Sequence, residues 1–401
     1  MTPLARRNSF AIRLCAGLAG YCSFINLYSP QAILPLLSEE FGATAAGIAT
    51  VMTASTLAVA LIAPFSGTAA DVLGRKRVIV AAMVVLAAPT VMAALAPTLP
   101  QLVFWRFVQG MTLPPIFAVA IAYIGEELPA HEATAVAGVY TSGASLGGFS
   151  GRFVTGILAD LIGWRNAFLV LAAVAVVCAL AVAALLPKER KFVRSAGFLA
   201  SAKQMFGHFR NPQLIATYAV GFGVLFNFIA TFTYISFRLA GPPYNLSATM
   251  LGAIFVVYLV GSALTPLIGK AVSRFGRRQF MIGTLAAWGA GMLLTLFEPL
   301  WLIVLGLTLA AACGLLCQAI STGYVAITAK AGRSSAVGLY VTSFYLGGSF
   351  GAALGGVAWT LGGWPACAAM TLAMLAIIAA IVFFAWTRTG SAPPPAAVEP
   401  A

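Results

Sequence analysis

Residues 138–164 read GVYTSGASLGGFSGRFVTGILADLIGW, and residues 338–364 read GLYVTSFYLGGSFGAALGGVAWTLGGW. The two segments align without a gap, and ten of the 27 positions are identical, including the Gly-Trp pair at the end of each segment. They lie 200 residues apart in a chain of 401 residues. The sequence therefore predicts two related halves that run in the same direction.

The composition indicates that lipid surrounds these halves. Hydrophobic residues make up 61% of the chain and charged residues only 8%, whereas soluble domains contain about 25% charged residues. The apolar segments are about 20 residues long, which suits one helical crossing of a ~30 Å hydrocarbon layer. Strands of a membrane barrel would instead alternate over about ten residues. We therefore expect an all-α polytopic membrane protein.

Clusters of proline and glycine divide the chain into twelve predicted spans. These are 10–37, 46–69, 77–96, 100–125, 133–159, 165–186, 213–238, 247–269, 279–296, 299–327, 335–361 and 365–386. The first is too long for the apolar core of a signal peptide and has no cleavage site. The spans predict four parts: a six-helix bundle at 1–186, a linker at 187–212, a second six-helix bundle at 213–390 and a disordered tail at 391–401. Within the linker, 195–209 could form an amphipathic helix.

The net charge of +13 is distributed over short connections, which argues against a nucleic-acid partner. With the N-terminus placed in the cytoplasm, 19 of the 23 lysines and arginines fall on the cytoplasmic side. Cytoplasmic loops retain basic residues, so this bias predicts cytoplasmic N- and C-termini and an even number of spans. The four exceptions lie within helices or at their outer ends: Arg106, Arg152, Arg165 and Arg238. The opposite connections carry acids instead, at Glu39, Glu40, Asp160 and Glu298.

A second repeat points to a family. The loop GTAADVLGRKR at 67–77 is matched by GKAVSRFGRRQ at 269–279. The first copy resembles the signature loop between helices 2 and 3 of the major facilitator superfamily, whose fold has two six-helix bundles related by pseudo-two-fold symmetry. The resemblance implies a conformational gate in which Asp71 pairs with Arg75. The expected gate residues are Gly67, Asp71, Gly74, Arg75, Arg274, Gly276 and Arg277.

Two further segments resemble motifs of the same family. LVFWRFVQGMTLPP at 102–115 is similar to its second motif, with Arg106 about six residues into a span. GASLGGFSGR at 143–152 is similar to the third motif, which marks the antiporter branch. Here the segment departs from the pattern, because Gly148 replaces a proline and Arg152 replaces the last glycine. An arginine in lipid costs at least ~2.5–3.5 kcal/mol, so both arginines should face the bundle interior.

Polar residues inside the spans are the candidates for binding a solute. On the seventh span, Asn227, Thr231, Tyr234 and Arg238 follow one face at spacings of 4, 3 and 4. In a membrane helix such a face lines a cavity or packs against other helices. The predicted substrate-binding set is Asn26, Gln31, Arg106, Arg152, Asn227, Tyr234 and Gln318.

The resemblance implies a transporter that exports a small amphipathic or anionic molecule by alternating access, with the proton as coupling ion. We expect a monomer in the bacterial inner membrane, without cofactor, metal or catalytic residues. No Asp or Glu lies in the middle of a span, although proton antiport usually needs a titratable carboxylate there. Uptake of a small organic anion by symport or facilitated diffusion therefore remains an alternative. A membrane-embedded enzyme is disfavoured, because no paired carboxylates or histidine clusters face the membrane core.

Overall fold

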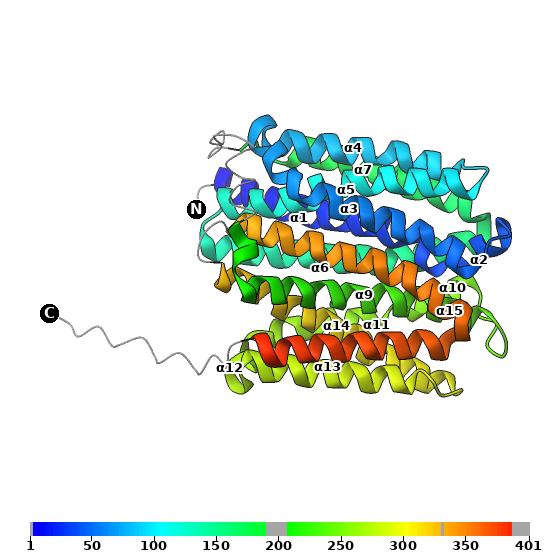
Figure 1. Ribbon diagram of the computed structural model, residues 1–401. Helices are drawn as coiled ribbons and strands as arrows, with labels where there is room; N and C mark the ends of the chain where they lie inside the picture. Colours follow the sequence, from blue (N-terminus) through cyan, green and yellow to red (C-terminus); the bar gives the residue numbers. More distant parts are fainter. Residues whose placement is uncertain (1–2, 190–206, 330–332, 387–401) are drawn as a thin grey trace.

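The computed structural model describes residues 3–189, 207–329 and 333–386, and these form helices without strands. The long helices lie side by side in one bundle (Figure 1). The all-α prediction is therefore confirmed for the described part of the chain. The elements of the first half are α1 (Pro3–Tyr28), η1 (Ser29–Ala32), α2 (Leu34–Glu40), α3 (Ala45–Leu73), α4 (Arg75–Ala94), α5 (Leu99–Glu127), α6 (Ala130–Ile162) and α7 (Trp164–Leu185).

The second half repeats this order with two interruptions. Its elements are η2 (His208–Arg210), α9 (Pro212–Ala240), α10 (Ala248–Ile254), α11 (Val257–Leu264), η3 (Thr265–Leu267), α12 (Ile268–Phe275), α13 (Arg277–Leu294), α14 (Leu300–Thr328) and α15 (Arg333–Ala385). The last of these is two helices joined at a kink, because Gly362 and Gly363 have non-helical backbone angles. Most of the predicted amphipathic helix at 195–209, and the predicted disordered tail at 391–401, lie outside the described residues.

Nine helices of the described chain are long and apolar enough to cross a membrane. One of them, Ser335–Ala385, includes the kink and so contains two of the predicted spans. The count of twelve crossings stays a prediction, because α6 and α13 are not among the nine.

Two predicted spans are not single helices. The span 10–37 is broken after Tyr28, where Pro30 enters a 3-10 turn and Pro35 begins a new short helix. Proline cannot donate the backbone hydrogen bond that would continue a helix. The span 247–269 is broken at Phe255, whose N–H bonds to the carbonyl of Gly252 in a tighter 3-10 pattern. Both breaks lie in the parts of the bundle where the two halves meet.

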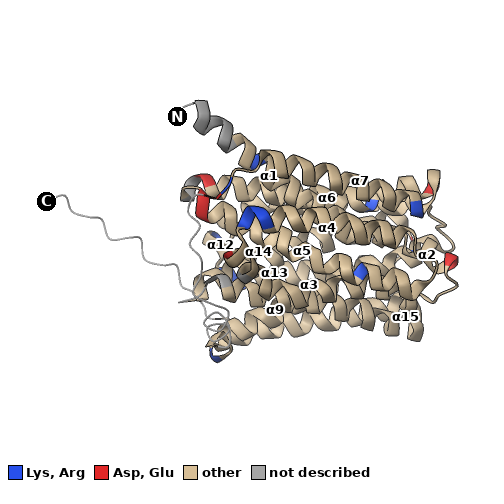
Figure 2. Cartoon of the chain, turned by 90° about the horizontal axis from the view of Figure 1, so that it is seen from above, with Lys and Arg blue, Asp and Glu red and all other residues tan. Residues whose placement is uncertain are grey.

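Most charged residues gather at the two ends of the bundle, and a few basic residues lie between them (Figure 2). The end at which α1 begins and α3 meets α4 carries Arg75, Lys76, Arg274 and Arg277, and we call it the basic end. The far end carries Glu40, Asp160, Arg165 and Glu298. The first described helix begins and the last one ends at the basic end (Figure 1).

The glycines of the 200-residue repeat occupy equivalent contacts in the two halves. A Cβ on Gly147 would lie 2.4 Å from the Tyr21 carbonyl oxygen of α1, and one on Gly347 would lie 1.9 Å from the Phe222 carbonyl oxygen of α9. Only glycine lets the helix backbones approach this closely. The repeat therefore preserves the packing of α6 on α1 and of α15 on α9.

Candidate functional site

Arg106 lies inside the first half with 1% of its surface exposed. Its Nη1 donates to the Asn26 carbonyl at 2.9 Å and to the Gln109 side chain, and its Nη2 donates to the Leu27 carbonyl at 2.6 Å and to Ser55 Oγ at 3.2 Å. The Gln109 amide nitrogen donates to Asn26 Oδ1 and to Thr90 Oγ1. α1, α3, α4 and α5 thus converge on one guanidinium.

This network is explained by the end of α1. The helix ends at Tyr28, and the last carbonyls of a helix have no partner within it. Arg106 supplies donors to two of them, at Asn26 and Leu27. Its positive charge also lies near the negative end of the helix dipole. The structure thus places the predicted binding residues Asn26 and Arg106 together, in a role that supports the break after α1.

Arg152 of α6 is equally buried, with 1% of its surface exposed, but it lies between the two halves. Its Nε donates to Gln31 Oε1 at 2.8 Å, and its Nη1 donates to the Gly148 carbonyl at 2.6 Å. Three rings surround the guanidinium carbon, with centroids at 4.2 Å for Tyr28 and 4.6 Å for both Phe255 and Tyr258. We call these three rings the aromatic cage.

The aromatic cage joins the halves, because Tyr28 belongs to α1 whereas Phe255 and Tyr258 flank the break between α10 and α11. Gln31 adds a second bridge, since its amide nitrogen donates to Thr233 Oγ1 of α9 at 3.2 Å. All the contacts described for Arg152 are neutral, so cation–π attraction rather than an ion pair holds the charge. Arg152 therefore carries a positive charge that lacks a carboxylate partner in the described chain.

At the far end, α6 of the first half crosses α10 of the second in close contact. A Cβ on Gly156 would lie 2.3 Å from the Ala248 carbonyl oxygen, and one on Gly252 would lie 2.7 Å from the Arg152 carbonyl oxygen. Asp160 Oδ2 accepts a hydrogen bond from the Thr249 backbone N–H at 2.8 Å. Desolvation acts to raise the pKa of Asp160, but hydrogen bonds from 247–249 outweigh it and hold the pKa below its ordinary value.

Other contacts between the halves lie near the middle of the helices. Thr56 of α3 shares a hydrogen bond of 2.9 Å with Ser349 of α15. Ser262 of α11 donates to Ser145 of α6 at 2.9 Å. Toward the basic end, α6 exposes Thr141 and Ser142, and α12 has no buried residue. Contacts between the halves therefore close the far end, whereas the basic parts of α6 and α12 carry exposed residues.

The remaining predicted binding residues lie inside the second half. Asn227 and Tyr234 of α9 are fully buried. The Asn227 amide donates to the Gly223 carbonyl and the Tyr234 hydroxyl donates to the Ala352 carbonyl. Within the part of the chain that the structure describes, Asn227 Oδ1 has no hydrogen-bond partner. Gln318 of α14 is half-buried. The structure thus brings Gln31 and Arg152 together, and leaves Asn227, Tyr234 and Gln318 outside that cluster.

The loop between α3 and α4 forms the ion pair that the sequence predicts. Arg75 Nη2 lies 3.0 Å from Asp71 Oδ1, and Arg75 also binds Glu126 at the end of α5 through two donors. Gly74 has a φ of +93°, a conformation that favours glycine. Glu189 Oε2 accepts from the Lys76 backbone N–H at 3.4 Å. Three carboxylates therefore surround this loop, and all belong to the first half or the residues directly after it.

Sequence reasoning considered Glu126 and Tyr258 as polar residues near or inside the spans, but it did not connect Glu126 with Arg75 or the aromatic cage with Arg152. Glu126 is 51 residues from Arg75, and Phe255 is 103 residues from Arg152, so no local pattern connects them.

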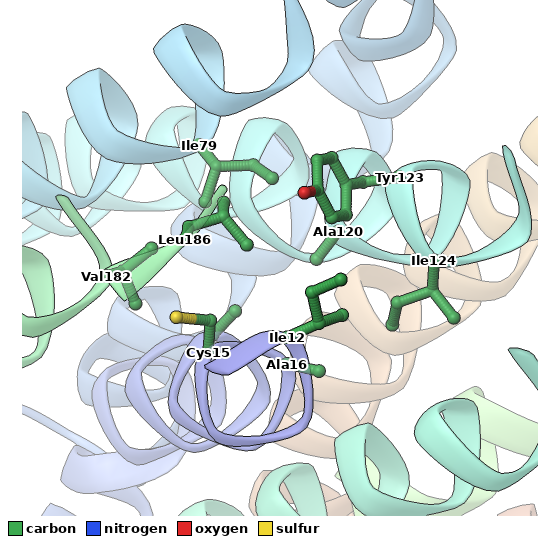
Figure 3. Close-up of a pocket in the computed structure, with 10 residues that line it drawn as sticks. Ile12, Cys15, Ala16, Ile79, Ala120, Tyr123, Ile124, Val182 and Leu186 are labelled. Atoms are coloured by element: carbon green, nitrogen blue, oxygen red, sulfur yellow. The ribbon is translucent and has the colours of Figure 1, made fainter. Parts of the chain in front are cut away.

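The cavity drawn in Figure 3 lies away from Arg152. The small cavity in Figure 3 lies among Ile12, Cys15, Tyr123, Val182 and their neighbours and holds about 10 Å³. That is about the space of a single water-sized probe, so it is a packing gap within the first half.

Comparison with known proteins places this geometry in a family. The family model described as "Major Facilitator Superfamily" matches residues 16–244 and 227–401. The inner membrane transport protein YnfM of Escherichia coli K12 is 32% identical over 368 residues, which cover 91% of this chain and 87% of that protein. A transporter of Buchnera aphidicola subsp. Schizaphis graminum, described as uncharacterized, is 30% identical over 85% of this chain and 83% of its own length.

Solved structures share the fold at low sequence identity. The nucleoside transporter NupG superposes with a TM-score of 0.75 at 16% identity and covers 94% of this chain and 100% of its own. The D-xylose-proton symporter also superposes with a TM-score of 0.75 at 16% identity, over 96% of this chain and 98% of its own. Identities this low bear on the fold alone.

Proposed function

Because the chain belongs to the Major Facilitator Superfamily and is a multi-pass membrane transporter, we propose that it exports a small amphipathic or anionic molecule by alternating access. Arg152 carries this proposal. It is a buried guanidinium between the two halves, and its described contacts are neutral groups. A guanidinium presents a two-donor fork that matches a carboxylate or phosphate.

The aromatic cage explains how Arg152 exchanges partners during transport. Phe255 and Tyr258 belong to the second half, so they withdraw from Arg152 when the far end opens. The guanidinium then needs a new partner, because an unpaired charge in a dry site is costly. An anionic solute supplies that partner. Gln31 belongs to the same site, since it joins Arg152 to Thr233.

In the proposed orientation the basic end faces the cytoplasm, as in the positive-inside rule, and the protein lies in a bacterial inner membrane as a monomer. The structure, with its far end closed, then corresponds to an inward-facing state. Opening and closing of the basic end is assigned to the two repeated loops, with Gly67, Asp71, Gly74 and Arg75 in the first and Arg274, Gly276 and Arg277 in the second. Asp71→Asn is expected to lower flux with little effect on folding.

Proton coupling is assigned to the cluster of Asp71, Arg75 and Glu126, since two carboxylates share one arginine there. A second candidate function is uptake or facilitated diffusion of a small organic anion. It is favoured by the position of the acids in the described chain, all of which lie near the ends of helices or in connections.

One experiment separates these functions. Ligands that stabilise the purified protein against heat are first identified from a panel of organic anions and amphipathic cations. Flux of the hit is then measured in proteoliposomes with and without a pH gradient. In proton-driven antiport, the solute moves opposite to the protons, and this driven flux stops when the pH gradient is removed. Facilitated diffusion continues without a pH gradient. A panel in which only cations stabilise the protein contradicts the role of Arg152.

A further inference from the structure

The two repeated loops differ in their counter-ions. Arg75 and Arg277 are equivalent, because each follows the glycine at the start of α4 or α13, and both glycines have positive φ angles of 93° and 77°. Arg75 is paired with Asp71 and Glu126. The position of Asp71 is taken by Ser273 in the second half, 202 residues later.

The second carboxylate is also missing. α5 and α14 both contain 29 residues, and Tyr123 and Tyr324 are equivalent at an offset of 201. The same offset places Ile327 where the first half has Glu126. Arg277 accordingly lies with its guanidinium carbon 5.6 Å from the centre of the Tyr324 ring, and its buried Nη1 has no hydrogen-bond partner among the described residues.

A groove lies close to this arginine, because Phe275 and Gln279, each two residues from Arg277, line it. It holds about 540 Å³ and lies between the end of α12, one face of α13 and α14. Its walls are almost entirely apolar and include Phe275, Phe280, Gly283, Ala287 and Leu316. This volume falls within the range of about 300–1,000 Å³ of ligand pockets.

Arg277 lies toward the basic end from the groove, on the α14 face that also forms part of the groove wall. Leu316 in the groove wall and Gly323 beside Arg277 are seven residues apart, so they lie on the same face of α14. Arg274 and Lys270 of α12 are exposed at the same end of the bundle. An apolar groove that lies near several cations at one end of the bundle matches an amphiphile with an anionic head.

We propose that the groove binds one anionic phospholipid of the cytoplasmic leaflet, with its phosphate on Arg277 and an acyl chain along α13 and α14. The proposal rests on the proposed orientation of the basic end, and not on the solute or the direction of transport. The lipid phosphate supplies the counter-ion that Asp71 and Glu126 supply to Arg75. A dissolved phosphate would satisfy the arginine but leave the groove empty.

The test is a lipid titration of the purified, delipidated protein, followed by native mass spectrometry. Phosphatidylglycerol and phosphatidylcholine are compared, with inorganic phosphate as a separate arm. The wild type is expected to bind one phosphatidylglycerol at least about tenfold more tightly than phosphatidylcholine, since the net negative charge of its headgroup strengthens the hydrogen bond with the guanidinium. Arg277→Gln is expected to lose this preference.

Three variants make the result specific. Arg278→Gln removes a neighbouring charge whose guanidinium lies over Phe383 of α15, 4.4 Å from the ring centre, and should keep the preference. Ile327→Glu restores the missing carboxylate on an exposed position and should abolish the preference. Gly283→Leu extends into the groove from a glycine with no atom within 4 Å of its Cβ. It should weaken long-chain more than short-chain phosphatidylglycerol.

Several outcomes overturn the proposal. Equal lipid preference in the wild type and Arg277→Gln excludes Arg277 as the headgroup site. Equal losses in Arg277→Gln and Arg278→Gln indicate a general effect of charge. If inorganic phosphate displaces phosphatidylglycerol at a similar concentration, and Gly283→Leu binds long-chain and short-chain lipid as the wild type does, the site belongs to a soluble anion. None of these measurements requires flux, so the transport proposal stands or fails separately.

Discussion

At the scale of single residues, the two buried arginines have different environments and therefore different expected roles. Arg106 lies within one half and binds the carbonyls at the end of α1, an interaction that does not change when the halves move. Arg152 lies between the halves and contacts rings from both. Both arginines are among the four basic residues that do not lie on the predicted cytoplasmic side. Of the two, only Arg152 lies where alternating access would change its neighbours.

Arg106→Ala is expected to destabilise the protein by about 3 kcal/mol or more, because buried acceptors that lose a charged donor each cost about 1–3 kcal/mol. Arg106→Lys should recover only part of this loss, since an ammonium cannot reach both carbonyls with a planar fork. Unfolding in denaturant, monitored by circular dichroism, measures the change.

The matched control is Arg165→Ala, which breaks an exposed pair with Glu40 at the far end. Exposed pairs contribute about 0–1 kcal/mol. If the two alanine variants were equally stable, the network around Arg106 would not support the end of α1.

Arg152→Lys keeps the charge but loses the fork to Gln31 and Gly148. If Arg152 binds the solute, apparent affinity for an anionic ligand should fall about tenfold or more while the protein remains folded, since Lys is a poor substitute at a bidentate site. Arg152→Gly should abolish the contact. Equal ligand affinities in wild type and both variants, measured by calorimetry, would exclude Arg152 as a solute contact and leave it a brace between the halves.

At the scale of elements, hydropathy and breakers located most helix ends within a few residues, as for the predicted 213–238 and the observed Pro212–Ala240. They did not find the break at Phe255, because no proline or glycine lies at that position. The burial of Arg152 was predicted correctly, since a charge exposed to lipid is costly. The partners of Arg152 could not be found, because Tyr28 and Phe255 come from helices that only the tertiary fold brings together.

The α6–α10 crossing gives a prediction at this scale. Gly156→Ala is expected to open the far end, because its Cβ would lie 2.3 Å from the Ala248 carbonyl oxygen and the helix backbones must separate. The distance between spin labels on Leu161→Cys and Met250→Cys, both exposed at the far end, should increase. Gly138→Ala in the same helix meets no atom within 4 Å and should leave the distance unchanged. Equal distances in both variants would show that the crossing does not close the far end.

At the scale of the whole molecule, the two ends of the bundle carry different chemistry. The basic end has an ion-pair cluster within the first half, whereas in the second half the buried Nη1 of Arg277 has no hydrogen-bond partner in the described chain. The far end has contacts that join the halves, through Gln31, Asp160 and the glycines of α6 and α10. This asymmetry corresponds to one extreme of a rocking motion.

The orientation can be tested directly. A cysteine placed at Glu40 or Glu298 of the far end should react with an impermeant maleimide added outside intact cells. A cysteine at Lys76 of the basic end should react only after the membrane is permeabilised. Labelling of the Lys76 position from outside would invert the topology and remove the argument that basic residues mark the cytoplasmic side.

The pH dependence of far-end closure follows from Asp160. Its pKa is lowered in the closed structure by hydrogen bonds from 247–249, against the opposing effect of desolvation. The charged carboxylate therefore favours the closed far end at any pH above the ordinary aspartate pKa of about 4, and this contribution is lost as pH falls through the lower pKa of the closed state.

Between pH 8 and 5, the spin-label distance between positions 161 and 250 should stay constant. Below about pH 4 it should increase in the wild type, and Asp160→Asn should remove this dependence. A change centred near neutral pH in the wild type, absent from Asp160→Asn, would contradict the lowered pKa and make Asp160 a candidate for proton coupling.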